Sequence, residues 1–291
     1  MKINPVLRNE GKISVRNWKF PLMVLIYTGI LTLGGVLLFK QLISDALIMG
    51  LNLKSSIIVY EIIAIVQTVL LLFIVPSLSS SAISSEREKQ TLEVLLSSKM
   101  SSLSIVMGKL FSSVSKVVLL IFLSLPVYGL SFLIGGVNFS SLVELSIFLI
   151  VTAFFVASIG IFFSTYLKST KASTAATYGT VLFIILGIFI ISIVMYYSKV
   201  SKSEAGAIIE YPTFVILSPV SGFISHLVRQ LGVENLTEGP LYLLKPMMQK
   251  NNFENYVYIS MAIQAACTLV LTLLSGYKLN PLKGAKLRRK K

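Results

Sequence analysis

The chain has 291 residues, of which 55% are hydrophobic and 13% are charged, and its mean hydropathy is +0.83. A soluble domain of this length needs more charge to cover its surface, so the composition excludes a soluble protein and predicts an all-α integral membrane protein. The formal net charge of +14 comes from basic residues gathered in one set of loops, which argues against nucleic-acid binding.

The N-terminal residues 1–19 are predicted to form a basic interfacial helix. Asn4 can act as the N-cap, and Pro5 then takes the first helical position, where its missing amide proton costs nothing. Apolar and cationic side chains alternate along the segment, which is typical of a helix lying on an anionic membrane surface. A frayed basic tail is the alternative interpretation.

Six apolar stretches are each long enough to cross about 30 Å of hydrocarbon at about 1.5 Å per helical residue. The predicted spans are 20–39, 57–78, 105–135, 142–167, 172–198 and 256–277. An even number of spans places both chain termini on the same side of the membrane.

Residues 79–104 connect the second and third spans and contain a charged helix, predicted over 84–96. Ser85 can cap this helix, with Glu88 three residues later completing a capping box. Three leucines fall on one face of such a helix, namely Leu92, Leu95 and Leu96. The charged opposite face cannot cross a bilayer, so the segment lies at or beyond the membrane surface. A solvated loop helix is the alternative interpretation.

The longest connection, residues 199–255, precedes the last span. Two pieces within it, 211–220 and 223–231, are apolar but too short to span, and they are interrupted by proline and glycine. They are predicted to form a pair of interfacial or re-entrant helices. The tail, 278–291, is strongly basic and suits anchoring at an anionic surface.

Most of the 26 lysine and arginine residues lie on the side that holds the termini and the 79–104 segment. The positive-inside rule therefore predicts a multi-pass cell-membrane protein with both termini in the cytoplasm. The 79–104 segment is then cytoplasmic, and the 199–255 loop is extracytoplasmic.

Residues 82–98 read A-I-S-S-E-R-E-K-Q-T-L-E-V-L-L-S-S, and 105–110 read I-V-M-G-K-L. These two motifs resemble the cytoplasmic segment of ABC type-2 exporter permeases, whose pattern is roughly A-I-x-x-E-R-E-x-G-T-L-E-x-L-L-x-[ST] followed by I-V-x-G-K-L. The opening N-P-V-L-R-N-E at 4–10 resembles the family's N-P-V-x-x-K-E. This chain departs from the pattern at Gln90, where the family usually has glycine.

The resemblance implies that the chain is a permease subunit without enzymatic activity of its own and without a cofactor. A separate cytosolic ABC ATPase would hold ATP and Mg, which agrees with the lack of a G-x-x-x-x-G-K-[ST] motif in the sequence. A second copy or a related permease would complete the transporter. The expected ATPase-coupling residues are Glu86, Arg87, Glu88, Thr91, Leu92, Glu93, Leu95 and Leu96.

Polar residues within the second span mark a possible transport pathway. Glu61 lies near the outer end of the span, with Gln67 and Thr68 a turn or two deeper. The apolar character of the spans favours an amphipathic or hydrophobic substrate, such as a peptide, a drug or a lipid-linked molecule, while ion extrusion stays open through the family resemblance.

Two other classes of protein compete with an exporter subunit. A six-span secondary transporter or ion channel would work without an ATPase, but it would need intramembrane carboxylates to couple an ion. An intramembrane enzyme is the other alternative. The single His226 and single Cys267 are too few for a metal site built from histidine and cysteine.

Overall fold

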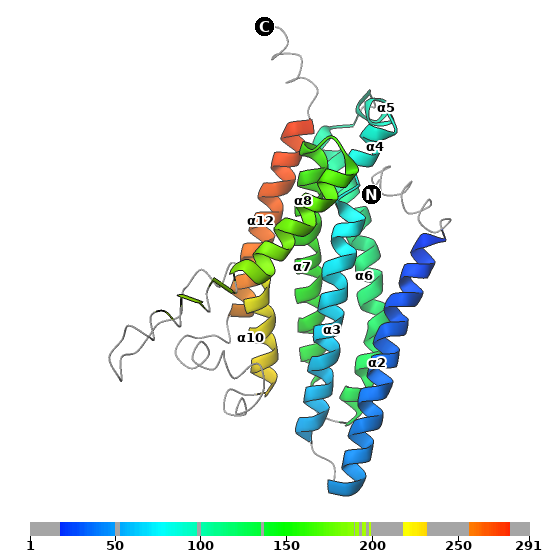
Figure 1. The fold of residues 1–291 in the computed structure, drawn as a ribbon, viewed down its shortest axis with the longest axis vertical. Helices are drawn as coiled ribbons and strands as arrows, with labels where there is room; N and C mark the ends of the chain where they lie inside the picture. Colours follow the sequence, from blue (N-terminus) through cyan, green and yellow to red (C-terminus); the bar gives the residue numbers. More distant parts are fainter. Residues whose placement is uncertain are drawn as a thin grey trace.

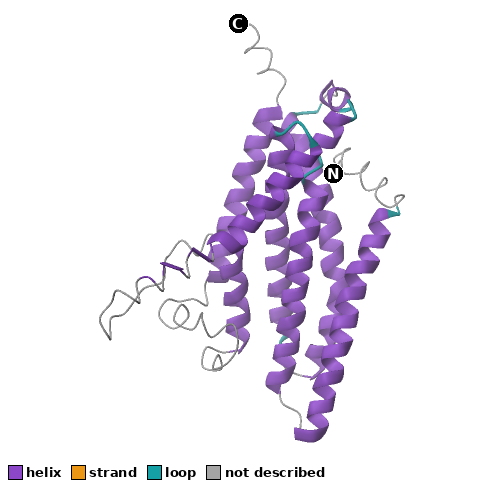
Figure 2. Ribbon diagram, in the orientation of Figure 1, coloured by secondary structure: helices purple, strands orange, loops and turns teal. Residues whose placement is uncertain are grey.

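The computed structural model describes residues 18–49, 53–97, 100–134, 137–188, 218–231 and 256–279, together with 190, 191, 194, 195 and 198. Within these residues all regular structure is helical (Figure 2). The elements in chain order are α2 (Lys19–Met49), α3 (Leu53–Ser79), α4 (Ser84–Glu88), α5 (Leu92–Ser97), α6 (Ser102–Ile134), α7 (Phe139–Tyr166), α8 (Thr170–Leu182), the π-helical turn η1 (Phe183–Gly187), α10 (Pro219–Leu231) and α12 (Tyr256–Leu279).

The long helices form one bundle whose charged end carries α4 and α5 (Figure 1). At this same end α2 begins, α3 ends, α6 begins, α7 ends and α12 ends. The charged segment between α3 and α6 therefore lies on the same side of the bundle as the start of α2 and the end of α12. We call this side the α4 end, and the other side the α10 end.

Five helical stretches have the length and apolar composition needed to cross a membrane. They are Lys19–Ser44, Ser56–Glu88, Ser102–Gly129, Phe139–Tyr166 and Tyr256–Leu279. The remaining predicted span, 172–198, corresponds to α8 and η1 together with residues that are only partly described, and it is not among the five. The six-span topology thus stays a prediction.

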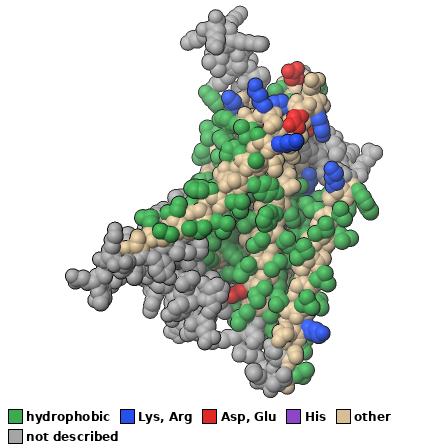
Figure 3. Space-filling model, in the orientation of Figure 1, with side chains coloured by type: hydrophobic (Ala, Val, Ile, Leu, Met, Phe, Trp, Pro, Cys, Tyr) green, Lys and Arg blue, Asp and Glu red, His purple; other side chains and the backbone are tan. Residues whose placement is uncertain are grey.

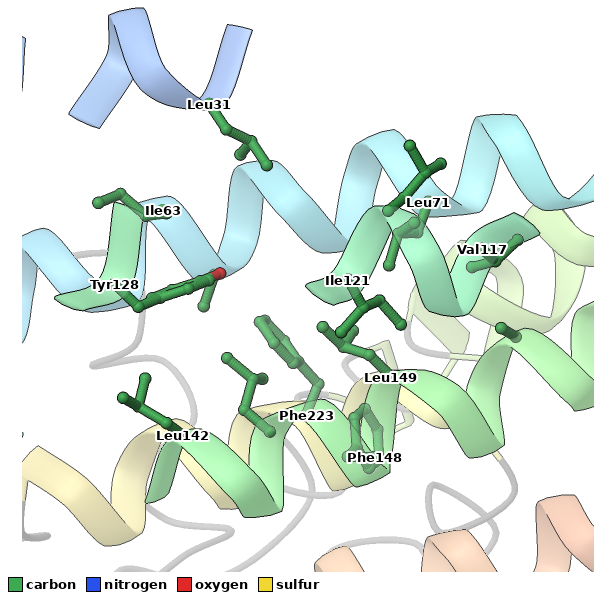
Figure 4. Packing of buried hydrophobic residues seen from close by; sticks show 14 of the residues in the cluster. Leu31, Ile63, Leu71, Val117, Ile121, Tyr128, Leu142, Phe148, Leu149 and Phe223 are labelled. Carbon is green, nitrogen blue, oxygen red and sulfur yellow. The ribbon is translucent and has the colours of Figure 1, made fainter. Parts of the chain in front are cut away.

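The core of the bundle is built around α7. In its most apolar window 67% of the residues are buried, against 22% for α2, so α7 is enclosed while α2 is peripheral. Figure 4 shows Ile121 and Leu149 pointing into this core from α6 and α7, with Phe223 joining them from α10. The outer surface of the helices is largely apolar, as in Figure 3, which suits contact with lipid.

Helix α10 lies beside α12 near the α10 end (Figure 1). Its 13 residues are too few to cross about 30 Å of hydrocarbon. It covers the second short piece predicted from the sequence, 223–231. Most of the first piece, 211–220, lies outside the described residues, so the expected helix pair is not established. The N-terminal segment 1–17 and the tail after Leu279 also lie outside them.

A close contact at Gly160 joins α7 to the turn after α3. A Cβ atom at residue 160 would lie 3.0 Å from the backbone nitrogen of Ser80 and would overlap the Ser79 side chain. Only glycine lets these two segments approach so closely, and this approach sets the position of α4, which follows the turn.

We expect Gly160→Ala to destabilise the protein by about 1–3 kcal/mol, because the added methyl group forces the α3 turn away from α7. Thermal unfolding in detergent measures this change. Gly34→Ala on α2 is the matched control, since nothing lies within 4 Å of a Cβ atom there. Equal melting temperatures for the two variants would contradict the packing described here.

Candidate coupling site at the charged end of the bundle

The charged segment is divided into two short helices rather than the single helix predicted over 84–96. The chain turns between α4 and α5 at Gln90, whose φ of 59° lies in the left-handed region. The amide of Thr91 donates to the carbonyl oxygen of Glu86, at 2.9 Å, and closes the turn. The family pattern has glycine at this position, and the backbone conformation gives the physical reason.

The predicted capping box is also wrong. Ile83 occupies the N-cap position of α4 and no side chain caps the helix from there. Instead, the backbone amides of Ile83 and Ser84 both donate to Ser164 Oγ on α7, each at 2.9 Å. Ser85 thus lies inside α4, and its own amide donates to the carbonyl oxygen of Ser81 at 3.0 Å, so Glu88 is not needed there and bonds elsewhere.

Glu86 bonds to α6. Lys109 Nζ donates to Glu86 Oε1 at 2.8 Å, and only 7% of the Lys109 side chain is exposed. The hydroxyl of Thr91 also donates to the Glu86 carboxylate. A lysine so enclosed requires a counter-charge, so this ion pair fixes α4 against α6.

Arg87 and Glu88 bond to the turn between α7 and α8. The Arg87 guanidinium donates to the carbonyl oxygens of Leu167, at 2.7 Å, and Thr165, at 3.0 Å, at the end of α7. Glu88 accepts from the amide of Thr170, at 2.7 Å, and from its hydroxyl, at 2.8 Å, at the start of α8. Each charge complements the helix end that it meets, since a helix is negative at its C-terminus and positive at its N-terminus.

The leucine face predicted for this segment packs onto the bundle. Leu92 is 8% exposed, and Leu95 and Leu96 are partly buried beside it. The cluster that receives them comprises Ile83, Ile105, Val106, Leu110, Ile161 and Leu279. Leu92 therefore fixes α5 against the bundle by apolar contact with residues of α6, α7 and α12.

The side chains left facing outward are Lys89, Gln90, Glu93 and Val94, which we call the α5 surface. Val94 is 72% exposed, which is high for an apolar side chain beside charged neighbours. The side chains of Glu86, Arg87 and Leu92, expected to contact an ATPase, are turned instead toward other helices of the same chain. Glu88 and Thr91 are exposed but also bonded within the chain.

The three pathway candidates on α3 do not share one surface. Gln67 is 1% exposed and faces α6, where its Nε2 donates to Ser124 Oγ at 2.9 Å and its Oε1 accepts from Tyr128. Thr68 donates to the carbonyl oxygen of Ala64 at 2.7 Å. Glu61 is 5% exposed, and its Oε1 has no hydrogen-bond partner.

A polar cluster at the α10 end was not predicted from the sequence. Arg229 on α10 forms an ion pair with Glu144 on α7. His226 is fully buried, with Nε2 3.2 Å from the Tyr60 hydroxyl and Nδ1 3.5 Å from a Glu144 oxygen. The signal available was one carboxylate and one guanidinium in otherwise apolar stretches. No group of residues able to hold a metal ion is found in the described part of the chain.

Removing one partner of the Glu86–Lys109 pair should leave the other charge without its partner. We expect Glu86→Gln or Lys109→Gln to lower the unfolding free energy by about 1–3 kcal/mol, and the double variant to cost less than the two single changes together. Thermal unfolding of all four proteins gives the coupling energy. Additive effects would show that the two groups do not interact.

The turn at Gln90 provides a second test. We expect Gln90→Gly to change stability by less than about 1 kcal/mol, because relief of left-handed strain is offset by greater freedom of the unfolded chain. Gln90→Val should destabilise the α4–α5 turn, since a β-branched residue tolerates this conformation poorly. A Val variant as stable as the Gly variant would disprove the backbone conformation assigned to residue 90.

The bundle of long apolar helices and its charged, internally bonded end agree with one known family. A comparison with curated proteins gives no match. A family model described as ABC-2 family transporter protein matches residues 5–277, which is nearly the whole chain. Proteins of this family are the membrane permeases of their transporters, and ATP hydrolysis lies in a separate subunit. The chain thus belongs to the ABC-2 transporter family as a multi-pass membrane permease.

Proposed function

We propose that this permease is the transmembrane half of an ATP-driven exporter, and that α4 and α5 receive the movement of a cytosolic ABC ATPase. The observation that carries the proposal is the bonding of Glu86, Arg87 and Glu88 to α6, the end of α7 and the start of α8. A force applied to α4 therefore reaches α6, α7 and α8 without passing through a flexible linker.

The orientation of the protein follows from the same charged end. The lysines and arginines gathered there favour the cytoplasm by the positive-inside rule, so we place the α4 end inside the cell and the α10 end outside. Charged side chains concentrate at the α4 end in Figure 3, beyond the apolar surface of the spans. A sixth span over 172–198 completes this topology, with both termini cytoplasmic.

The docking surface proposed for the ATPase is the α5 surface, Lys89, Gln90, Glu93 and Val94, rather than the whole E-R-E motif. Val94 provides an exposed apolar contact, while Glu93 and Lys89 provide charges around it. This combination, an apolar centre with a polar rim, is typical of protein interfaces. The E-R-E side chains then transmit the movement that the α5 surface receives.

A second permease subunit, either another copy of this chain or a close relative, completes the proposed exporter. The substrate we propose is an amphipathic or hydrophobic molecule, because the described helix surfaces at membrane depth are mainly apolar. Outward transport is supported by the resemblance of the 82–98 motif to exporter permeases.

Val94→Asp tests the docking surface. With the permease co-expressed with its ATP-binding subunit, we expect about ten-fold less co-purified ATPase, while the melting temperature of the permease stays the same. Leu92→Asp should lose both the ATPase and thermal stability, since Leu92 is buried.

Phe139→Asp is the matched control, an equal change of an exposed apolar residue at the α10 end. It should leave co-purification unchanged. Undiminished ATPase binding by the Val94 variant would reject the α5 surface as the docking site, and transport by the permease without ATP or partner would reject the exporter itself.

A further inference from the structure

Helix α10 is attached to the bundle in two different ways. Its first half is held by close packing, since a Cβ atom at Gly222 would lie 2.7 Å from the Ser260 side chain and 2.9 Å from the Phe148 ring. Its second half, residues 226–231, also carries the polar cluster around His226. The attachment of the second half therefore depends on groups that can change their charge.

The hydrogen bonds around His226 determine which ring nitrogen carries its proton. The side-chain Nε2 of Gln230 lies 3.0 Å from His226 Nε2 and can only donate, so the ring nitrogen accepts. The same amide donates to the Tyr60 hydroxyl at 3.4 Å, which leaves the hydroxyl hydrogen to point at His226 Nε2, 3.2 Å away. His226 is therefore neutral, and the proton on its Nδ1 faces a Glu144 oxygen at 3.5 Å.

A second proton on His226 is unfavourable in this position. A proton on Nε2 would point at the Gln230 amide, which is itself a donor. Rotating that amide would restore a hydrogen bond, but the positive charge would stay fully buried. Burial lowers the pKa of His226 to about 4, while attraction by Glu144 opposes this shift and repulsion by Arg229 adds to it.

The other titratable or charged groups near His226 come from the helices that pack against α10. They are Tyr60 and its neighbour Glu61 on α3, Glu144 on α7, Arg229 on α10 and Tyr258 on α12, whose ring lies beside Arg229. The turn η1 contains only apolar residues and glycine. Because Glu144 and Arg229 are already paired with each other, a proton on His226 adds a positive charge that this pair does not neutralise.

A polar cavity gives protons a route to the cluster. It has a volume of about 280 Å³, which is enough to hold water. Glu144, Arg229 and Gln230 line it together with polar residues at the start of α7. Glu144 thus connects the cavity with the buried imidazole that it faces.

We propose that α10 is held by an acid-sensitive contact, in which protonation of His226 favours release of residues 226–231 from α3 and α7. A released histidine has its ordinary pKa of 6.5, whereas the pKa of the attached one is about 4. The attachment is therefore strongest above about pH 6.5 and weakens as the pH falls toward about 4. With the α10 end outside the cell, as proposed above, the relevant pH is that of the extracytoplasmic side.

His226 is the only histidine in the chain, so its state can be measured without any substitution. The full-length permease, purified with a histidine-free tag, is labelled with nitrogen-15 in the histidine ring and studied by NMR in phosphatidylcholine nanodiscs. At about pH 7.5 we expect a neutral ring with its proton on Nδ1, and a protonation midpoint well below the ordinary value. A proton on Nε2 at neutral pH, or a midpoint at or above the ordinary value, would overturn the proposal.

Hydrogen–deuterium exchange tests whether protonation loosens α10. After correction for the intrinsic pH dependence of exchange, we expect the amides of 226–231 to exchange about ten-fold faster at about pH 4.5 than at about pH 7.5. The internal reference is residues 105–114 of α6, at the α4 end, whose corrected exchange should stay the same.

Two variants separate His226 from the carboxylates that also titrate in acid. His226→Gln keeps an acceptor near Nε2 but binds no proton, so acid should no longer accelerate exchange in 226–231. Tyr60→Phe is the matched control, because it removes a hydrogen bond from the cluster but leaves His226 to titrate. It should retain the ten-fold acceleration.

Acceleration that persists in His226→Gln would assign the effect to Glu144 or Glu61 and overturn the proposal. If His226→Gln does not fold, the NMR midpoint of the unmodified protein still decides. Neither experiment contains an ATPase or a substrate. A negative result therefore rejects the acid-sensitive contact and leaves the proposed export function standing.

Discussion

The bonding of three consecutive charged side chains to three different helices is the constraint on which this end of the molecule depends. Glu86 pairs with Lys109 on α6, Arg87 binds the end of α7, and Glu88 binds the start of α8. Bonds between a charge and a helix end contribute about 0.3–1 kcal/mol each at exposed positions and more where solvent is excluded. Two such bonds, together with the Glu86–Lys109 ion pair, make α4 an integral part of the bundle instead of a mobile loop.

A similar arrangement occurs at the α10 end. There Arg229 pairs with Glu144 on α7, and the fully buried His226 contacts the Tyr60 hydroxyl on α3. At both ends a helix too short to span is thus attached to the bundle through polar groups of α7 or its following turn. Because α7 is also the most enclosed span, it is the common support for both ends.

The features that the sequence could predict depend on residues close together in the chain. The features that it could not predict depend on residues far apart in the chain. Apolar length identified long helices, and spacing along a helix placed Leu92, Leu95 and Leu96 on one face. The capping box failed because α4 begins before Ser85, at Ser84, where Ser164, 80 residues away in the chain, accepts from the first amides. Nothing local indicates that Glu88 would bond to Thr170, and only the unusual Gln90 marked the turn that divides the helix.

The distribution of these contacts limits how the permease can move. A force on α4 and α5 passes to α6, α7 and α8 through polar bonds and to α12 through the cluster that holds Leu92. Helix α2 packs mainly against α3 and α6 and is mostly exposed. Displacing α2 therefore removes the least buried packing among the long helices. The connected helices should therefore move together as one body. If the transporter contains two such permeases, a pathway that opens and closes is more readily formed between the two bodies than within either of them.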